Sequence, residues 1–227
     1  HFGREQLQFV RNVLAHVPRE SLVVLSMHIP LRCHLDPGNP ADTTADYQDL
    51  LRLLDGRPHT VSFAGHLHAT EHHYLDVPGA ASRHLHHHHV LTAACGSWWS
   101  GPRDYRGIPC ADSTDGTPNG FHILSVDGHR YHTEFVPAIG KRIAKLRATV
   151  DASEAGTTEQ LLVNVFDGGP RTRVTCRFAG HDWTELAIAS MRDPMICRLF
   201  GGGAPRKDWV QPTLSSHIWA APLPGQI

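Results

Sequence analysis

Two short, uncharged segments constrain the fold of this chain more than any other feature of its sequence. Leu22–Leu25 and Thr60–Ala64 have the length of strands, and neither contains a charged residue. Uncharged strands of this kind are typical of sheets that are covered on both faces. Apolar residues recur every three or four positions in residues 7–17 and again in residues 47–54, which predicts two helices. The order helix–strand–helix–strand predicts an α/β layer with parallel strands.

The next part of the chain is expected to contain a strand, a long loop and a hairpin. Val90–Ala94 is predicted to be a strand, and Gly96–Gly120 a loop because it is rich in Gly, Pro and Asp. Phe121–Val126 and Arg130–Val136 have the composition of strands and flank Asp127-Gly128. This dipeptide is a strong signal for a tight β-turn, so the two segments are predicted to pair as a hairpin.

Beyond Pro137 the sequence changes to short β-rich pieces that turn residues separate at fairly regular spacing. This pattern is typical of a small β-sandwich. We therefore predict one domain in residues 1–140 and an all-β sandwich domain in residues 141–227. The strands predicted for the second domain are Arg147–Val150, Leu161–Phe166, Arg173–Arg177, Glu185–Ile188 and His217–Trp219.

Histidine is the outlier of the composition, with 19 residues against 3 Met and 4 Tyr. His28 follows the first predicted strand, and Gly65-His66-Leu67-His68 follows the second. The carboxyl ends of neighbouring parallel strands meet at one edge of a sheet. We therefore expect His28, His66 and His68 to meet there, where three imidazoles suit zinc, iron or manganese. The alternative is that the pair at 66 and 68 is exposed in a loop and that His28 is packed in the core.

The overall charge and the length of the apolar runs limit the kinds of partner that we expect, and the spacing of the cysteines limits their chemistry. Lys+Arg is 21 and Asp+Glu is 22, so the net charge of -1 does not indicate binding to nucleic acid. No apolar run approaches the roughly 20 residues that a membrane-spanning helix needs. The five cysteines form no Cys-x-x-Cys pair, and we interpret them as free or buried thiols.

Several segments together resemble the calcineurin-like metallophosphoesterases, and in particular a bacterial subgroup with an appended C-terminal β-domain. Ser21–Leu31 is similar to the strand of that family that ends in a single histidine, and Gly65–His68 to its Gly-His-x-His motif. Gly96–Pro102 and Asp115–Phe121 resemble the long loop of the subgroup, and Ser215–Pro224 a segment of its last domain. The resemblance thus extends over most of the chain.

The resemblance implies a fold, a reaction and a set of ligands. The fold is α/β, half of a four-layer αββα sandwich, followed by the small all-β sandwich. The reaction is the hydrolysis of a small-molecule phosphoester, a monoester or a diester, by a hydroxide that bridges two divalent ions of Mn, Fe or Zn. His28 and His66 are assigned to one ion and His68 to the other. The subgroup also suggests a periplasmic or secreted location, while the oligomeric state is left open.

Four residues are predicted to contact substrate. Within the cluster His84–His89, alternate residues of a strand share a face, so His86 and His88 are expected to point together toward phosphate oxygens. An exposed polar edge is the alternative for this cluster. Trp98 is interpreted either as packing between the domains or as an apolar wall for the alcohol group. Asp115 is interpreted as a turn former or as a substrate contact.

The chain departs from the family pattern in one respect. The family places Asp-x-His, Gly-Asp and Gly-Asn-His motifs before the single-histidine strand, and residues 1–27 contain none of them. We therefore expect an incomplete site and a chain that begins after the first half of the domain. Asp127–His129 and Gly38–Asp42 imitate two of the motifs, and both are expected to be ordinary turns.

Two other functions remain open. The first is a non-catalytic, histidine-rich protein that binds metal through His84–His89, for zinc handling or storage. The second is ligand binding by residues 141–227 alone, with an inert histidine-bearing domain.

Overall fold

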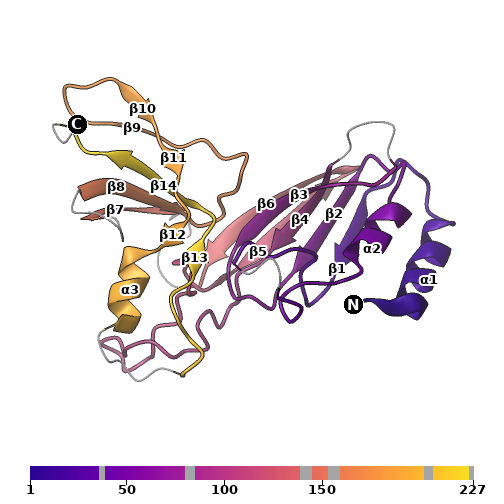
Figure 1. Ribbon diagram of the computed structural model, residues 1–227, viewed down its shortest axis with the longest axis horizontal. Coiled ribbons are helices and arrows are strands. Elements are labelled where there is room, and N and C mark those ends of the chain that lie inside the picture. Colours follow the sequence, from indigo (N-terminus) through magenta and orange to yellow (C-terminus); the bar gives the residue numbers. More distant parts are fainter. Residues whose placement is uncertain (36–38, 80–84, 139–144, 153–158, 202–206, 225–227) are drawn as a thin grey trace. The chain divides into compact units, whose positions relative to one another are not determined.

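The structure is a computed structural model that describes residues 1–35, 39–79, 85–138, 145–152, 159–201 and 207–224 (Figure 1). These residues form a β-rich fold with three helices and several open sheets. They divide into two compact units, which are described separately below. The first unit comprises His1–Leu67, His72–Leu91 and His122–Glu134, and the second comprises His68–Glu71, Thr92–Phe121 and Phe135–Ile227.

A four-stranded sheet forms the centre of the first unit. Its strand order is β1 (Val23–Ser26), β2 (Thr60–Ala64), β4 (Leu85–Val90) and β3 (Glu71–Asp76). β2 runs parallel to both β1 and β4, which confirms the predicted parallel arrangement. β2 is buried along most of its length, as predicted. β1 is buried less, because Val24 on its second face is 42% exposed.

The helices α1 (Gly3–Leu14) and α2 (Tyr47–Leu53) cover one face of this sheet (Figure 1). Their apolar residues and those of β1 share one core, which contains Leu14, Val23 and Leu50. The periodicity of residues 7–17 therefore predicted the helix and its buried face, although α1 ends at Leu14, three residues earlier than the pattern.

One carboxylate joins the two helices. Asp46 lies at the start of α2, and its side chain accepts hydrogen bonds from the backbone N–H groups of Phe2 (2.7 Å) and Gly3 (2.9 Å) at the start of α1. Burial raises the pKa of Asp46, but the bonds from Gly3 and Phe2 outweigh it, and the net pKa is lowered. The charged form of Asp46 is therefore the form that holds α1 against α2.

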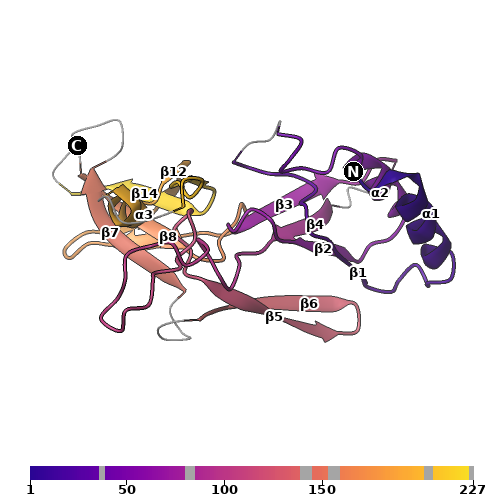
Figure 2. The same cartoon turned by 90° about the horizontal axis from the view of Figure 1, so that it is seen from below.

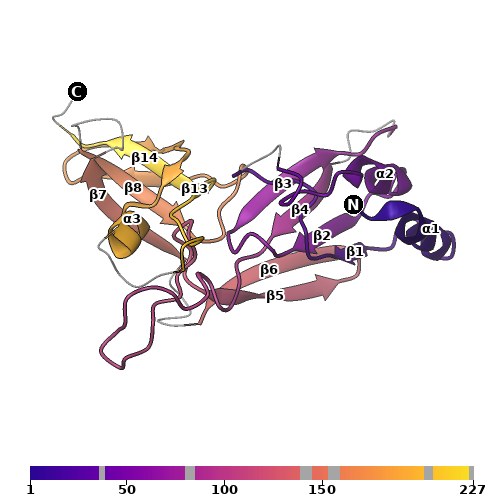
Figure 3. The same cartoon turned by 60° about the horizontal axis from the view of Figure 1, so that its bottom comes forward.

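A hairpin of β5 (Gly120–Asp127) and β6 (Arg130–Pro137) lies along the other face of the sheet (Figures 2 and 3). Gly128 in its turn has φ +59°, which confirms the hairpin predicted from Asp127-Gly128. Tyr131 of β6 is hydrogen-bonded to His87 of β4, and the ring of His122 of β5 meets the ring of His89 edge-on. The first unit thus has three layers: helices, sheet and hairpin.

The predicted strand Val90–Ala94 is wrong. The strand is β4, Leu85–Val90, and it consists mainly of the histidine run itself. Its register with β2 pairs Val61 with His87 and Ala64 with Val90, so the ladder ends where β2 ends. Parallel pairing with a buried neighbour decides this strand, because the strand propensity of its own residues is low.

The described part of the second unit contains a four-stranded antiparallel sheet, two small antiparallel strand pairs and a helix. Four of the five predicted strands are confirmed with small shifts of their ends, whereas Glu185–Ile188 is divided between two strands of different sheets. The sheet has the order β11 (Ala187–Ile188), β14 (Ile218–Pro222), β8 (Glu159–Val165) and β7 (Leu146–Ala152). The smaller elements are β9 (Thr175–Arg177), β10 (Trp183–Glu185), β12 (Met191–Arg192), β13 (Leu214–Ser215) and α3 (Pro194–Gly201).

The domain boundary, the cysteines and the lengths of the helices were also subjects of sequence predictions. The predicted boundary near residue 140 lies outside the described residues and stays a prediction. The five cysteines form no disulfide in the described structure. Among the described helices, none combines the length and the apolar character that crossing a membrane requires.

We predict that Asp46→Ala lowers the free energy of unfolding by about 1 kcal/mol, because two backbone N–H groups lose their acceptor. Because the folded pKa of Asp46 is lowered, the wild-type stabilisation is present above the unfolded pKa of about 3.9 and is lost as the pH falls through the folded value. Urea unfolding at pH 7 and at pH 3 measures both effects. Asp49→Ala, which removes an exposed partner of Arg52, is the control, and an equal loss in both variants would contradict this role.

Candidate metal centre

His28 and His66 come together at the edge where β1 and β2 end. The hydrogen-bond ladder continues past both strands, since Met27 N–H donates to Phe63 O (3.0 Å) and Gly65 N–H donates to His28 O (3.1 Å). This extension brings the two rings together edge to face, with a hydrogen bond of 3.2 Å between His28 Nε2 and His66 Nδ1. The ladder explains why histidines 38 positions apart in the sequence face each other.

The distance between these nitrogens fits a shared metal ion. Two nitrogens bound to one ion at about 2.1 Å, at angles between roughly 90° and 109°, lie about 3.0–3.4 Å apart. The other nitrogen of His66, Nε2, lies 3.4 Å from Asp42 Oδ1. A carboxylate on the second nitrogen of a ligating imidazole orients the ring and makes it a stronger ligand. The donor set formed by His28 and His66, with Asp42 behind it, therefore suits a divalent ion.

Asp42 belongs to a turn that the sequence analysis treated as ordinary, and that interpretation is confirmed. Asn39 Oδ1 accepts from Ala41 N–H (3.0 Å), and Asn39 Nδ2 donates to Asp42 Oδ2 (2.7 Å). The same turn nevertheless delivers the other oxygen of Asp42 to His66. Sequence reasoning missed this contact because the loop that brings residue 42 back to the sheet edge has no regular pattern.

The backbone of the Gly-His-x-His segment is strained. His66 has φ +69° and His68 has φ +53°, both in the left-handed region that side chains other than glycine rarely adopt. Leu67 N–H donates to Gly65 O at 2.8 Å, which closes a tight turn between them. Strain of this kind costs on the order of 1–3 kcal/mol per residue and is concentrated at ligand and active sites.

His68 belongs to the second unit, where two contacts determine its tautomer and ring position. Its Nδ1 is hydrogen-bonded to the carbonyl oxygen of Gly96, and its ring stacks on Trp98 with centroids 3.9 Å apart. A carbonyl oxygen only accepts, so Nδ1 carries the proton and Nε2 keeps its lone pair. His68 is therefore prepared to bind a metal through Nε2.

Trp98 also packs against the apolar cluster around α3, which contains Ile196 and Phe200. Its own backbone has φ +56°, a further strained position in the loop after β4. The structure thus shows Trp98 as the support of His68, and its predicted contact with substrate stays a prediction.

His86 and His88 share a face of β4, as predicted, and both are fully buried on the side of the helices. Leu31 N–H donates to His88 Nε2 (3.0 Å), so His88 Nδ1 donates to Ser62 Oγ (2.7 Å). The Ser62 hydroxyl then donates to His86 Nε2 (2.7 Å), and His86 Nδ1 donates to Thr60 Oγ1 (2.8 Å). Burial, followed by repulsion from neighbouring histidines, lowers the pKa of His88 well below its usual value. Both residues join β4 to β2, and their predicted role in substrate binding stays untested.

Asp115 is the turn former that the sequence suggested, and it is also part of a buried network. Its Oδ1 accepts from Thr117 N–H (2.9 Å), while Oδ2 accepts from Thr70 N–H (2.7 Å) and from His217 Nε2 (3.0 Å). Asp115 is 1% exposed and His217 is fully buried. This carboxylate therefore connects three segments of the second unit that are far apart in sequence.

Both nitrogens of His217 act as donors. Nε2 faces the Asp115 carboxylate, and Nδ1 lies 2.9 Å from Asn164 Oδ1. Asn164 must present its oxygen there, because its nitrogen donates to Asp193 Oδ2 (2.7 Å) and to the carbonyl oxygen of Asp115 (3.2 Å). Both ring nitrogens thus face acceptor oxygens, an arrangement that suits a buried ion pair of Asp115 and His217. Burial raises the pKa of Asp115, but the bond and charge of His217 outweigh it and lower the net pKa.

A comparison with protein families matches residues 88–227 to the C-terminal region of calcineurin-like phosphoesterases. The match covers more than half of the chain. The chain belongs to the calcineurin-like phosphoesterase family. No match to it was found among curated proteins or among solved structures.

The family match covers one group of candidate site residues and not the other. The matched region contains Trp98, Asp115 and His217, whereas His28 and His66 lie before it. The phosphoesterase family implies small-molecule substrates and divalent metal ions, and the chain holds groups of histidines that can bind such ions. The family and these groups of side chains therefore agree on the use of divalent metal ions.

We predict that Asp115→Asn and His217→Gln each lower the free energy of unfolding of this phosphoesterase-family chain by about 3 kcal/mol, because each leaves a buried partner without its counter-charge. Because the folded pKa of Asp115 is lowered, its contribution is present above the unfolded pKa of about 3.9 and is lost as the pH falls through the folded value. Thermal and urea unfolding of the wild type and both variants, from pH 7 to pH 3, measure the loss of stability and its pH dependence.

Asp104→Asn is the control for this pair, because Asp104 lies in the same loop and pairs with Arg106 at the surface. We expect it to change stability little. If Asp115→Asn were as stable as Asp104→Asn, the buried ion pair would not be holding the second unit together.

Proposed function

We propose that the protein acts in the metal-dependent hydrolysis of a phosphoester, a monoester or a diester, with His28, His66 and His68 as metal ligands. The single observation that carries this proposal is the pair His28 Nε2 and His66 Nδ1, 3.2 Å apart and backed by Asp42. Membership of the phosphoesterase family supports the reaction class. Divalent ions bound there supply an activated water and neutralise charge on the phosphoryl oxygens.

The chain's own residues prepare the site in four ways. Asp42 holds the His66 ring by its Nε2, which leaves Nδ1 for the ion. The Gly96 carbonyl keeps the proton of His68 on Nδ1, which leaves Nε2 as the donor. Trp98, stacked on His68, is the residue that we propose as the apolar wall beside the alcohol group of the substrate. His86, His88 and Asp115, which are buried, act as supports from behind.

We propose two ions, of Mn, Fe or Zn, because imidazole suits all three metals. His28 and His66 are assigned to one ion and His68 to the other. Two cations close together need anionic ligands between them, and residues 1–27 contain none of the acidic motifs of the family. The proposal therefore assigns the histidine ligands to His28, His66 and His68 and assigns no anionic ligand.

We also propose a specific architecture for each of the two predicted domains. The order of helices, sheet and hairpin in the first unit is what three layers of an αββα sandwich require. The antiparallel sheet of β11, β14, β8 and β7 supports a β-sandwich domain in residues 141–227. By the same family resemblance we propose a periplasmic or secreted location.

The alternative function, a non-catalytic histidine-rich metal-binding protein, is favoured by one observation. His72, His87 and His89 form a group that could hold a metal ion, and they lie apart from the strand ends at His28 and His66. Metal binding without hydrolysis in the natural protein would support this alternative.

We predict that His28→Ala and His66→Ala each reduce hydrolysis of p-nitrophenyl phosphate and bis(p-nitrophenyl) phosphate at least about 100-fold, because each removes a ligand. Asp42→Asn should cost roughly 10- to 100-fold, because it removes only the support of a ligand. The assay uses the natural gene product that carries residues 1–227, with added Mn²⁺ or Zn²⁺, and bound metal is measured in parallel.

His129→Ala is the matched control, because His129 stacks on His59 at the hairpin turn and belongs to the Asp-x-His sequence that imitates a family motif. This variant should retain the bound metal and the rate of hydrolysis of the wild type. Full hydrolysis and metal content in His66→Ala would exclude the proposed centre, and loss of both in His129→Ala would instead place the hairpin turn in the site.

A further inference from the structure

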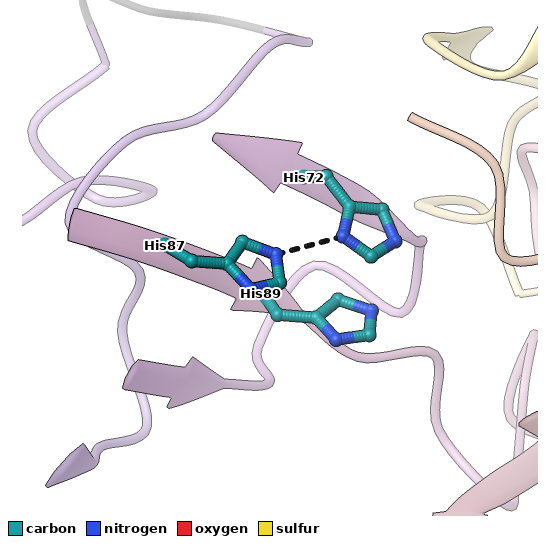
Figure 4. A group of neighbouring side chains, drawn as sticks. All are labelled: His72, His87 and His89. Carbon is teal, nitrogen blue, oxygen red and sulfur yellow. Dashed lines mark hydrogen bonds between the residues drawn. The ribbon is translucent and has the colours of Figure 1, made fainter. Parts of the chain in front are cut away.

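The sheet face that lies against the hairpin carries a second group of histidines. His72 extends from β3, and His87 and His89 extend from β4 toward the same side (Figure 4). His72 Nδ1 lies 2.9 Å from His87 Nε2, and the rings of His72 and His89 stack with centroids 3.9 Å apart. These three side chains share no residue with the centre formed by His28, His66 and His68.

We propose that His72, His87 and His89 bind one zinc ion. One nitrogen of each ring lies within 4.8 Å of one nitrogen of each of the other two rings. Nitrogens bound to one tetrahedral zinc ion at about 2.1 Å lie about 3.4 Å apart. The three rings are stacked nearly parallel, so zinc binding requires the side chains to rotate until their nitrogen lone pairs converge on the ion. The strands themselves do not have to move, because all three Cβ atoms already point to one side of the sheet.

Tyr131 supports the proposed site from behind. Its hydroxyl is hydrogen-bonded to His87 Nδ1, the ring nitrogen that is turned away from His72. When Nε2 of His87 binds the ion, the proton of this ring stays on Nδ1 and is donated to the oxygen of Tyr131. Partners of this kind fix the ring and tautomer of a ligating histidine and contribute roughly 10- to 100-fold to metal affinity.

The three imidazoles favour zinc over Mg²⁺ and Ca²⁺. Three imidazoles offer nitrogen and no anionic oxygen, whereas Mg²⁺ and Ca²⁺ prefer oxygen ligands. Zinc accepts three histidines and keeps a fourth position for water. His89 is fully buried, while His72 and His87 are half-buried, so the group is sheltered yet accessible from one side.

The position of the site would let a bound ion connect three parts of the first unit. β3 is the edge strand of the sheet and β4 is its neighbour, and Tyr131 belongs to β6 of the hairpin. An ion held by His72, His87 and His89 therefore joins the edge strand to the sheet and, through Tyr131, to the layer above it. Binding to the folded state alone stabilises that state in proportion to the free zinc concentration.

The test uses the full chain with His28→Ala and His66→Ala as a common background, so that the proposed hydrolytic centre does not contribute metal. We expect this background to retain about one zinc ion per chain after equilibrium dialysis, and zinc to raise its melting temperature. Adding His72→Gln should reduce zinc affinity at least about ten-fold and remove the rise in melting temperature. Tyr131→Phe should weaken zinc about ten-fold while the zinc-free protein melts as before.

His73→Gln is the matched control, because His73 is the next residue of β3 and faces His88 on the other side of the sheet. It should keep the zinc affinity of the background. Cobalt absorption bands that disappear in His72→Gln and His87→Gln, but persist in His73→Gln, identify the ligands directly. Absence of zinc from the background, or unchanged affinity in His72→Gln, would overturn the proposal, and neither result depends on whether the protein hydrolyses phosphoesters.

Discussion

The parallel pairing of β1, β2 and β4 is the constraint on which the rest of the first unit depends. The backbone ladder between β1 and β2 does not stop at the strand ends, since the bond from Gly65 N–H to His28 O extends it by one further step. That step brings His28 against His66. Because the ladder determines both position and direction, two residues that are far apart in sequence become neighbours, and their side chains then form a hydrogen bond.

The same ladder divides the histidines of β4 between two environments. Alternation places His86 and His88 among the core residues beneath the helices, where hydrogen bonds to Ser62 satisfy both rings. His87 and His89 are turned toward the hairpin, where they meet His72 and Tyr131. Successive residues of a strand point to opposite faces of the sheet. The histidine run of β4 therefore forms a buried, neutral chain of hydrogen bonds on one face. On the other face it contributes side chains to a group of possible metal ligands.

Local patterns predicted much of this fold, and their failures have physical reasons. Residues 7–17 and 47–54 carry helical periodicity, and Asp127-Gly128 marks a turn, so both helices and the hairpin were predicted. Strands β3 and β4 were missed or displaced, because Glu71–Asp76 and Leu85–Val90 owe their extended conformation to pairing with neighbours and not to their own propensity. Asp42 was not recognised beside His66, because an irregular loop carries no periodic signal that reports its direction.

The sequence by itself determined the helix–strand–helix–strand order of residues 1–64, the position of two histidine groups past strand ends, and the resemblance to the phosphoesterase family. Only the tertiary structure decided which ring nitrogens face each other, that Asp42 lies beside His66, and that His217 lies between Asp115 and Asn164. The reason is that periodicity and turn signals are local properties of the chain, whereas a metal-binding distance or a buried ion pair arises only when distant segments are brought within a few ångströms of one another.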